Sequence, residues 1–244
     1  MSKIKIATAL LGGLLTSAYA GGAQASVVYS DFNSFNGANT ALIDGFNVTT
    51  SAGGVFEQKG NAVSGTFGVG VGGAGSVVGG EIDGGLPNTP PEFIRFESNS
   101  GSRLLSAFTV AFLYAAPAFG DQVNESASIV INGTAYILSV VDTISATFTF
   151  GAGATVENVS PGDGTHGGEW RVTFTNPLSF TSIQFDPGPT GGSAAPLGDY
   201  AFGSLTTADA VPGPIVGAGL PGLVMALGGL VILARRRRHQ AGVA

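Results

Sequence analysis

The segment that most limits how this chain can fold is an uncharged run near its C-terminal end. Residues 215–234, twenty in all, contain no charged side chain. A helix of that length is about 30 Å long, which matches the hydrocarbon core of a bilayer. Its glycines and its proline would weaken a soluble helix, whereas lipid tolerates them because no water competes for the backbone hydrogen bonds. The run therefore predicts a transmembrane helix rather than a buried core helix.

A basic cluster follows this run directly, and it consists of Arg235, Arg236, Arg237 and Arg238. Positive charge beside a membrane span is retained on the cytoplasmic side. The cluster is thus expected to act as a membrane stop, with residues 239–244 as a short cytoplasmic tail.

The N-terminal end has the order of a secretory signal peptide. Two lysines precede an apolar stretch at residues 6–15, and small residues follow it. Ala23 and Ala25 form the best small-x-small motif, which predicts cleavage after residue 25. Residues 18–20 offer an alternative motif. We therefore expect residues 26–210 to be exported through the inner membrane, with the C-terminus in the cytoplasm.

A proline pair stands between the exported region and the predicted span, in the motif Val211, Pro212, Gly213 and Pro214. Signal peptide, proline pair, apolar span and arginine cluster, in this order, resemble the PEP-CTERM sorting signal, here residues 211–238. The resemblance implies an exopolysaccharide-producing Gram-negative envelope. The implied partners are the inner membrane, the export machinery and a membrane-embedded sorting peptidase called exosortase. Gly213 stands where the family has glutamate, so the tail is either cleaved or kept as a plain anchor.

The predicted exported region is strongly acidic. All sixteen carboxylates lie in it with only four basic residues, which leaves a net charge of about −12. Such a domain repels phosphate backbones, so the sequence argues against nucleic-acid binding. The chain has no cysteine, which excludes disulfides, thiolate metal sites and a cysteine nucleophile.

Short β-type runs separated by turn residues dominate residues 26–210, which are rich in Gly, Ser, Thr, Val and Phe. This pattern predicts one all-β domain, an antiparallel β-sandwich of jelly-roll-like type. The expected strands are 27–32, 46–50, 93–97, 107–114, 128–131, 135–140, 147–150, 170–175, 182–185 and 200–205.

Turn chemistry adds three local predictions. Asn132 and Gly133 supply the two positive-φ positions of a type I′ hairpin turn. A second hairpin is expected between residues 170–175 and 180–185. The glycine-rich stretch 51–85 is either a long loop or a pair of weak strands. It contains a G-x-G-x-x-G match, which we interpret as coincidence because no helix pattern follows it.

The sequence marks no catalytic group of residues. The only histidine of the exported region, His166, stands in a glycine-rich segment, which makes a Ser-His-Asp triad or a zinc site improbable. Hard oxygen ligands in turns leave a structural calcium ion open as the one cofactor. The ligand candidates are Asp31, Asp163, Glu169, Asp186 and Asp199.

Trp170 is the only tryptophan. Its alternation with Val172 and Phe174 favours a place in the core, and stacking on a sugar ring is the alternative.

These observations favour a non-enzymatic protein of the cell surface or extracellular matrix. We expect it to be membrane-anchored or released by the sorting peptidase and to bind or organise polysaccharide. Two alternatives stay open. One is an envelope glycan hydrolase that uses a pair of carboxylates, and the other is an adhesin whose strand edges pair between copies.

Overall fold

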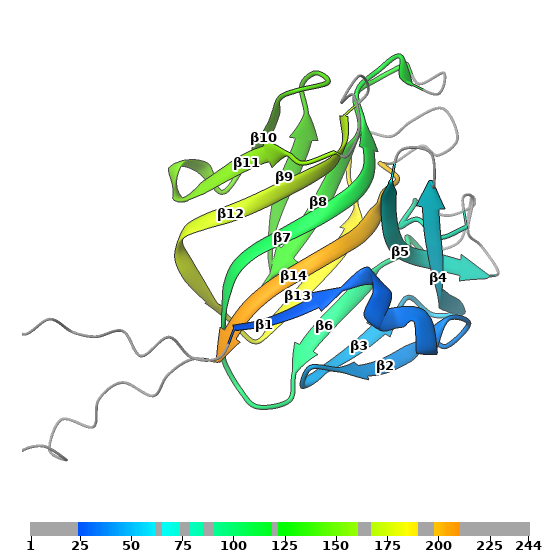
Figure 1. The fold of residues 1–244 in the computed structure, drawn as a ribbon, viewed down its shortest axis with the longest axis vertical. Helices are drawn as coiled ribbons and strands as arrows, with labels where there is room; N and C mark the ends of the chain where they lie inside the picture. Colours follow the sequence, from blue (N-terminus) through cyan, green and yellow to red (C-terminus); the bar gives the residue numbers. More distant parts are fainter. Residues whose placement is uncertain are drawn as a thin grey trace, which may run out of the picture.

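The computed structural model describes residues 24–61, 65–73, 79–84, 90–118, 122–160, 167–189 and 198–209. In this part of the chain, two antiparallel sheets of seven strands each lie face to face around one hydrophobic core (Figure 1). The predicted antiparallel β-sandwich is confirmed, while its jelly-roll-like character stays a prediction.

The first sheet has the strand order β11-β12-β7-β14-β5-β4, and β1 also pairs with β14. Its strands are β1 (Gln24–Val28), β4 (Gly54–Asn61), β5 (Thr66–Gly73), β7 (Arg103–Tyr114), β11 (Ala154–Asn158), β12 (Gly167–Phe180) and β14 (Ala201–Asp209). A 3-10 helix, η1 (Tyr29–Phe35), follows β1, and a second one, η3 (Gly151–Gly153), precedes β11.

The second sheet has the order β10-β9-β8-β13-β6-β3-β2. Its strands are β2 (Thr40–Ile43), β3 (Phe46–Thr50), β6 (Ile94–Ser98), β8 (Ser126–Ile131), β9 (Thr134–Val140), β10 (Ala146–Phe148) and β13 (Ser182–Pro187).

Phenylalanine rings fill the space between the sheets. The Phe96 ring, from β6, has its centroid 4.9 Å from that of Phe202 in β14 and 5.9 Å from that of Phe185 in β13. All three side chains are fully buried. Every second residue of β13 is buried, as the period of two in a strand with one core face requires. The core therefore joins both sheets into one unit.

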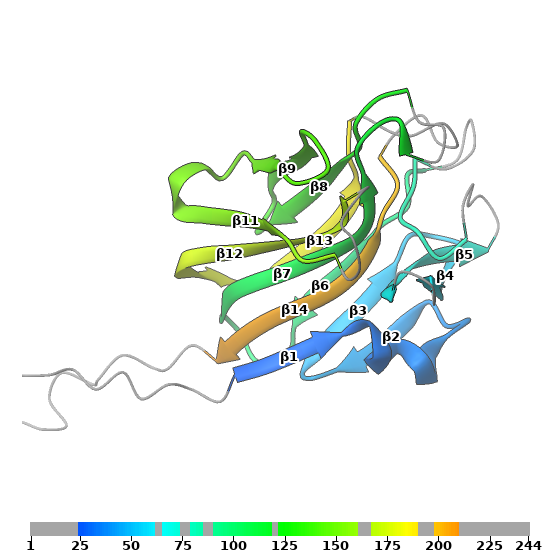
Figure 2. The ribbon, with the colours of Figure 1, turned by 45° about the horizontal axis from the view of Figure 1, so that its top comes forward.

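The pairing of β1 with β14 brings both ends of the described chain to one end of the sandwich. Gln24 stands opposite Ala208, and β14 ends one residue later at Asp209. We call this end the terminal pole. The opposite end is the loop pole, which residues 115–118, 122–125, 141–145 and 188–189 form. Figure 2 shows the start of β1 beside the end of β14, away from the loop pole.

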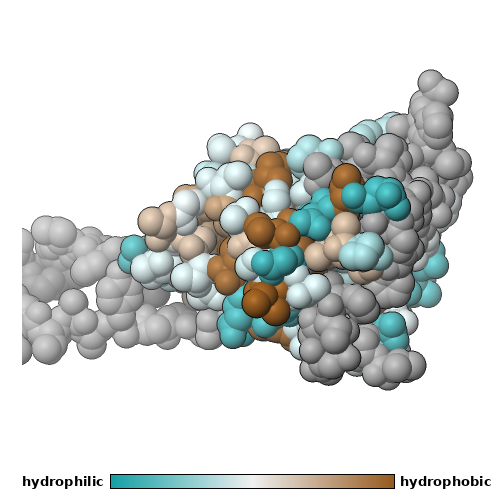
Figure 3. Space-filling view, turned by 90° about the horizontal axis from the view of Figure 1, so that it is seen from above, coloured by the Kyte–Doolittle hydropathy of each residue, from teal (hydrophilic) through white to brown (hydrophobic). Residues whose placement is uncertain are grey.

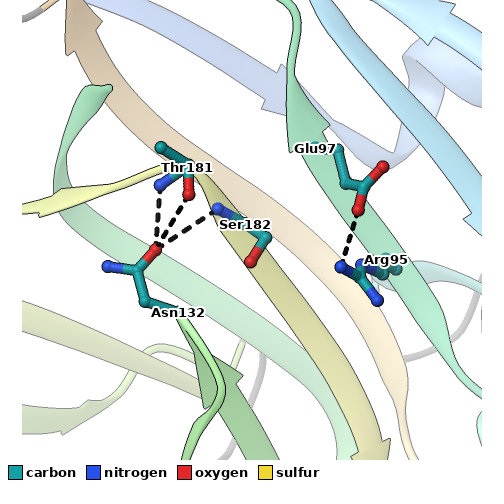
Figure 4. A network of polar contacts seen from close by, with 5 residues as sticks. All are labelled: Arg95, Glu97, Asn132, Thr181 and Ser182. Atoms are coloured by element: carbon teal, nitrogen blue, oxygen red, sulfur yellow. Dashed lines mark hydrogen bonds and ion pairs between the residues drawn. The ribbon is translucent and has the colours of Figure 1, made fainter. Parts of the chain in front are cut away.

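The Asn132-Gly133 hairpin between β8 and β9 is confirmed. Both residues have positive φ, 50° and 83°, as a type I′ turn requires. The Asn132 side chain also ties the turn to the end of β12, because its Oδ1 accepts a hydrogen bond from the Thr181 N–H at 2.9 Å (Figure 4). Figure 4 also shows the Arg95–Glu97 ion pair on the neighbouring strand β6, where the N–O distance is 2.6 Å.

Two expectations about strands are wrong. The second hairpin does not form, because β12 continues to Phe180 alongside β7 and β13 lies in the other sheet. Residues 174–177 are taken up as an irregularity inside β12 instead. The strand expected at 27–32 ends at Val28, where η1 begins.

The glycine-rich stretch contains the pair of weak strands, β4 and β5, which form a hairpin. In β5, Val69 and Val71 face the core, while the alternate glycines lie on the opposite face of the strand and are buried there as well.

Candidate functional site

Buried acidic side chains are concentrated around the part of the first sheet that lies next to the loop pole. Five carboxylates there are almost completely buried, namely Glu81, Asp83, Glu92, Glu125 and Asp199. Two of them bind backbone N–H groups. Glu92 accepts from Asp83 at 3.1 Å, and Glu125 accepts from Tyr114 at 2.6 Å. Burial of charge is costly, and buried ionisable groups are typical of functional sites. The concentration of carboxylates therefore makes this region a candidate functional site.

A β-bulge at Phe112 shapes this part of the sheet. Leu113 pairs with Gly168 and Ala111 pairs with Glu169, so Phe112 is the extra residue of β7. Its φ of 63° lies in the left-handed region, which costs about 1–3 kcal/mol for a residue with a side chain. Bulges often re-aim side chains beside functional sites.

The bulge reverses the alternation of β7. Leu113 joins the main core, while Phe112 packs with Ala111 and Ala201 in a separate cluster on the outer face of the sheet. The half-buried Tyr114 packs against this second cluster. The bulge thus places Phe112 and Tyr114 on the outer face of the sheet instead of in the core.

Lys59 and Glu81 form an ion pair beside these rings. Lys59 Nζ lies 2.5 Å from Glu81 Oε1 and 5.1 Å from the centroid of the Phe112 ring. The Glu81 side chain is 5% exposed and that of Lys59 is 29% exposed. The pKa of Glu81 is raised to about 7, mainly by burial; Lys59 opposes the rise, and the Asp199 and Asp83 carboxylates contribute to it. Glu81 therefore titrates near neutrality.

The chain segment 79–84 holds Glu81 in this position. The Val71 N–H donates to the Glu81 carbonyl at 2.9 Å, and the Ile82 N–H donates to the Tyr200 carbonyl at 2.6 Å. The segment thus joins β5 to the start of β14. Gly70 makes its close approach feasible, because a Cβ there would lie 2.4 Å from the Glu81 backbone. Gly70 of the G-x-G-x-x-G match therefore allows the segment 79–84 to pack on β5.

We call Lys59, Glu81, Phe112, Tyr114 and Asp199 the outer-face site. Burial raises the pKa of the Tyr114 phenol far above its usual value, and the Glu81, Glu125 and Asp199 carboxylates add to the effect. The phenol is thus a hydrogen-bond donor at neutral pH, beside an ammonium group and a carboxyl group that titrates near 7. Of these residues the sequence analysis had singled out Asp199 alone.

A second candidate surface lies on the loop pole. Val123, Val141 and Ile144 are 47%, 50% and 77% exposed. Figure 3 looks onto this end, where apolar groups lie among hydrophilic ones. The Asn124 side chain links the two loops, since its Nδ2 donates to the Val141 carbonyl at 2.7 Å. Hydrogen bonds from the Ile144 N–H and from Ser145 lower the pKa of the exposed Asp142, which is thus an ionised acceptor there.

Of the five residues proposed as calcium ligands, the four that the structure describes do not gather into a metal site. Within the described part of the chain, no group of three or more His, Asp or Glu residues is placed to hold an ion. Asp31 accepts a hydrogen bond from the Val28 N–H at 2.8 Å, and Asp186 accepts one from the Gln184 amide at 2.7 Å. Burial raises the pKa of both Asp186 and Glu169. Asp163 lies outside the described residues.

Trp170 lies in the core. It is fully buried, and its indole N–H donates to the Leu113 carbonyl at 2.9 Å. The core placement favoured by its alternation is confirmed, and the alternative of a sugar-stacking face at Trp170 is wrong.

Several predicted segments lie outside the described residues. They are Ala23 of the signal peptide, His166, the motif 211–214 and the arginine cluster 235–238. Ala25 belongs to β1 and stands opposite Thr207. In the part of the chain that the structure describes, no helix has the length and apolar character to cross a bilayer.

Comparisons with known proteins found no matching family model and no matching curated protein. Among solved structures, a carbohydrate binding module of family 29 has a TM-score of 0.32 and 10% identity, over 75% of this chain and 88% of that chain. A family 29 module complexed with cellulohexaose has a TM-score of 0.28 and 12% identity, over 76% and 88%.

The catalytic unit of a thermostable GH87 alpha-1,3-glucanase from Streptomyces thermodiastaticus strain HF3-3 has a TM-score of 0.33 and 15% identity, over 81% of this chain and 29% of that unit. TM-scores this low carry no argument about the function of this chain.

Proposed function

We propose that this chain is an exported surface protein whose β-sandwich binds polysaccharide without catalysis. A C-terminal anchor would hold it at the inner membrane, or a sorting peptidase would release it. The signal-peptide pattern, the proline motif and the uncharged run of the sequence support the export and the anchor.

The observation that carries the proposal is the pairing of β1 with β14. It brings both ends of the sandwich to the terminal pole, so an anchor that follows Asp209 would keep this pole towards the membrane. The loop pole would then face outward, with its exposed apolar side chains among polar ones. Sugar rings present apolar C–H faces together with hydroxyl groups. The exposed apolar side chains of the loop pole can contact the C–H faces, and its polar groups can bond the hydroxyl groups.

The two alternatives fit the geometry less well. Glu81, with its pKa near 7, has the protonation of a general acid, but its side chain is buried against Lys59. The described edge strands β2, β10 and β11 have four, three and five residues, which is short for edge pairing between copies. The longer β4 has its Phe56 backbone bonded to Gly37 and Ala38.

The cellular part of the proposal is tested by fractionation of the producing cells and mass spectrometry of the protein's termini. We expect a mature N-terminus at a small-x-small motif and the protein in the envelope or the medium. Retention of Arg235–Arg238 would identify the anchored form, and their loss would identify the processed form. An untrimmed protein in the cytosol would refute the proposal.

The binding part is tested by affinity electrophoresis of the full-length protein in gels that contain the polysaccharide of the producing cells. We expect Ile144→Asp and Val141→Asp to abolish the retardation. Leu42→Asp is the matched control, because Leu42 is 63% exposed on β2, away from the loop pole. Equal retardation of all three variants would contradict binding at the loop pole.

A further inference from the structure

The Lys59–Glu81 pair has an unusual combination of contact and burial. The nitrogen and oxygen are 2.5 Å apart, and the carboxyl group is almost completely removed from water. Lys59 comes from β4, while Glu81 comes from the segment that joins β5 to β14. Lys59 is also the only lysine among residues 26–210. An amine and a carboxyl group are therefore held in contact by separate parts of the fold.

The surroundings favour the neutral form of the Glu81 carboxyl group. Desolvation disfavours charged groups, and transfer of one proton from the ammonium to the carboxylate gives an amine and a carboxylic acid without any net uptake of protons. Burial raises the pKa of Glu81 to about 7, so its acid form is accessible at neutral pH. The Phe112 ring flanks Lys59 on the outer face. A neutral amine beside a neutral carboxylic acid has the reactants of amide formation.

We propose that Lys59 and Glu81 condense to an isopeptide bond. The Lys59 Nζ lone pair attacks Glu81 Cδ, so a C–N bond forms and the bond from Cδ to one carboxyl oxygen breaks. The buried Asp199 carboxylate, whose charge raises the pKa of Glu81, accepts a proton from the nitrogen and returns it to the departing hydroxyl. One water molecule leaves. No oxidation, reduction or further reactant is involved.

The bond would join β4 covalently to the segment 79–84. A cross-link of this kind restricts the unfolded chain in the way that a disulfide does. Exported proteins commonly use disulfides for this purpose, and this chain has no cysteine. The isopeptide bond would give an exported sandwich a covalent staple that needs no oxidising partner.

The test is the mass of the full-length or naturally processed protein under denaturing conditions. We expect a mass lower by one water molecule than the sequence requires. Proteolysis should release a branched peptide that joins residues 59 and 81. Lys59→Arg keeps the positive charge but has no primary amine, so its mass should be undiminished. Asp199→Asn should leave most chains uncondensed.

The wild-type measurement decides the question even if a variant fails to fold. An undiminished mass, together with Lys59 fully labelled by an amine reagent after denaturation, overturns the proposal. A loss of water that maps to any other part of the chain overturns it as well.

Discussion

Asn132 allows the energy of one turn to be divided into a backbone part and a side-chain part. Its φ of 50° lies in the left-handed region, which costs alanine about 1–2 kcal/mol. Its side chain accepts from the Thr181 N–H at 2.9 Å and donates to the Ser179 carbonyl at 3.0 Å. Two such bonds contribute about 0.5–1.5 kcal/mol each, towards the lower end here because the residue is exposed. Asn132→Ala should therefore lower the free energy of unfolding by about 2–4 kcal/mol.

Asn132→Gly separates the two parts, because glycine adopts positive φ freely but has no side chain to bond. We expect a loss of about 1–2 kcal/mol for the glycine variant. Urea unfolding followed by the emission of the single tryptophan measures both variants. Asn47→Ala is the control, since Asn47 is exposed and its amide contact to Asn99 is long, 3.4 Å. Equal losses for the alanine and glycine variants would refute the backbone argument, and a glycine variant as stable as wild type would refute the role of the side chain.

Three further predictions concern the core and the outer-face site. Burial raises the pKa of Glu81 to about 7 beside Lys59, against about 4.3 for an ordinary glutamate, and Lys59→Arg, which cannot condense, keeps both this burial and a cation beside the carboxyl group. The folded state then binds more protons between these values, so stability should fall by up to about 3 kcal/mol as pH rises from 4.5 to 8. Urea titrations at several pH values measure this slope, and adding Glu81→Gln should flatten it. Trp170→Phe should lower the free energy of unfolding by about 2–4 kcal/mol, because it leaves a void in the core and removes the hydrogen bond to the Leu113 carbonyl. Urea unfolding followed by circular dichroism measures this loss, and a value below about 1 kcal/mol would contradict the packing of Trp170. Gly70→Ala should displace the segment 79–84 and lower the free energy of unfolding by about 2 kcal/mol or more. Because Glu81 then moves away from Lys59, the protein should keep the full mass of its sequence. Gly203→Ala is the control: the added Cβ meets only contacts of 3.2 Å or longer, so the cross-link should still form.

Features set by neighbouring residues were predictable from the sequence. Strand β3 has the predicted bounds, Phe46–Thr50, because apolar and polar residues alternate and turn residues flank it. The Asn132-Gly133 turn follows from the backbone preferences of two adjacent residues. The burial of Trp170 follows from the alternation of its own strand. Each of these signals spans only a few positions.

Features set by distant residues were not predictable. The bulge at Phe112 depends on the register of β7 against Gly168, and nothing in the local sequence marks a phenylalanine for positive φ. The second hairpin failed for a similar reason. Asn176 and Pro177 look like a turn, yet β12 absorbs them because residues on both sides of them keep pairing with β7. The one usable signal for the outer-face site was Lys59, the single lysine among the four basic residues of a strongly acidic region.

The proposed isopeptide bond also bears on why the fold tolerates its buried carboxylates. Burial of an ion pair costs several kcal/mol per ion unless the geometry compensates for lost hydration. Glu81 meets this cost beside Asp83 and Asp199, which both disfavour its charge. Condensation with Lys59 removes one positive and one negative charge together, so the net charge stays the same while a buried ion pair becomes a neutral amide. It also removes the group whose titration should make the Lys59→Arg variant pH-dependent. If the stability of the Lys59→Arg variant falls between pH 4.5 and 8 while that of the wild-type protein lacks this fall, the difference is evidence for the bond that does not depend on the mass measurement.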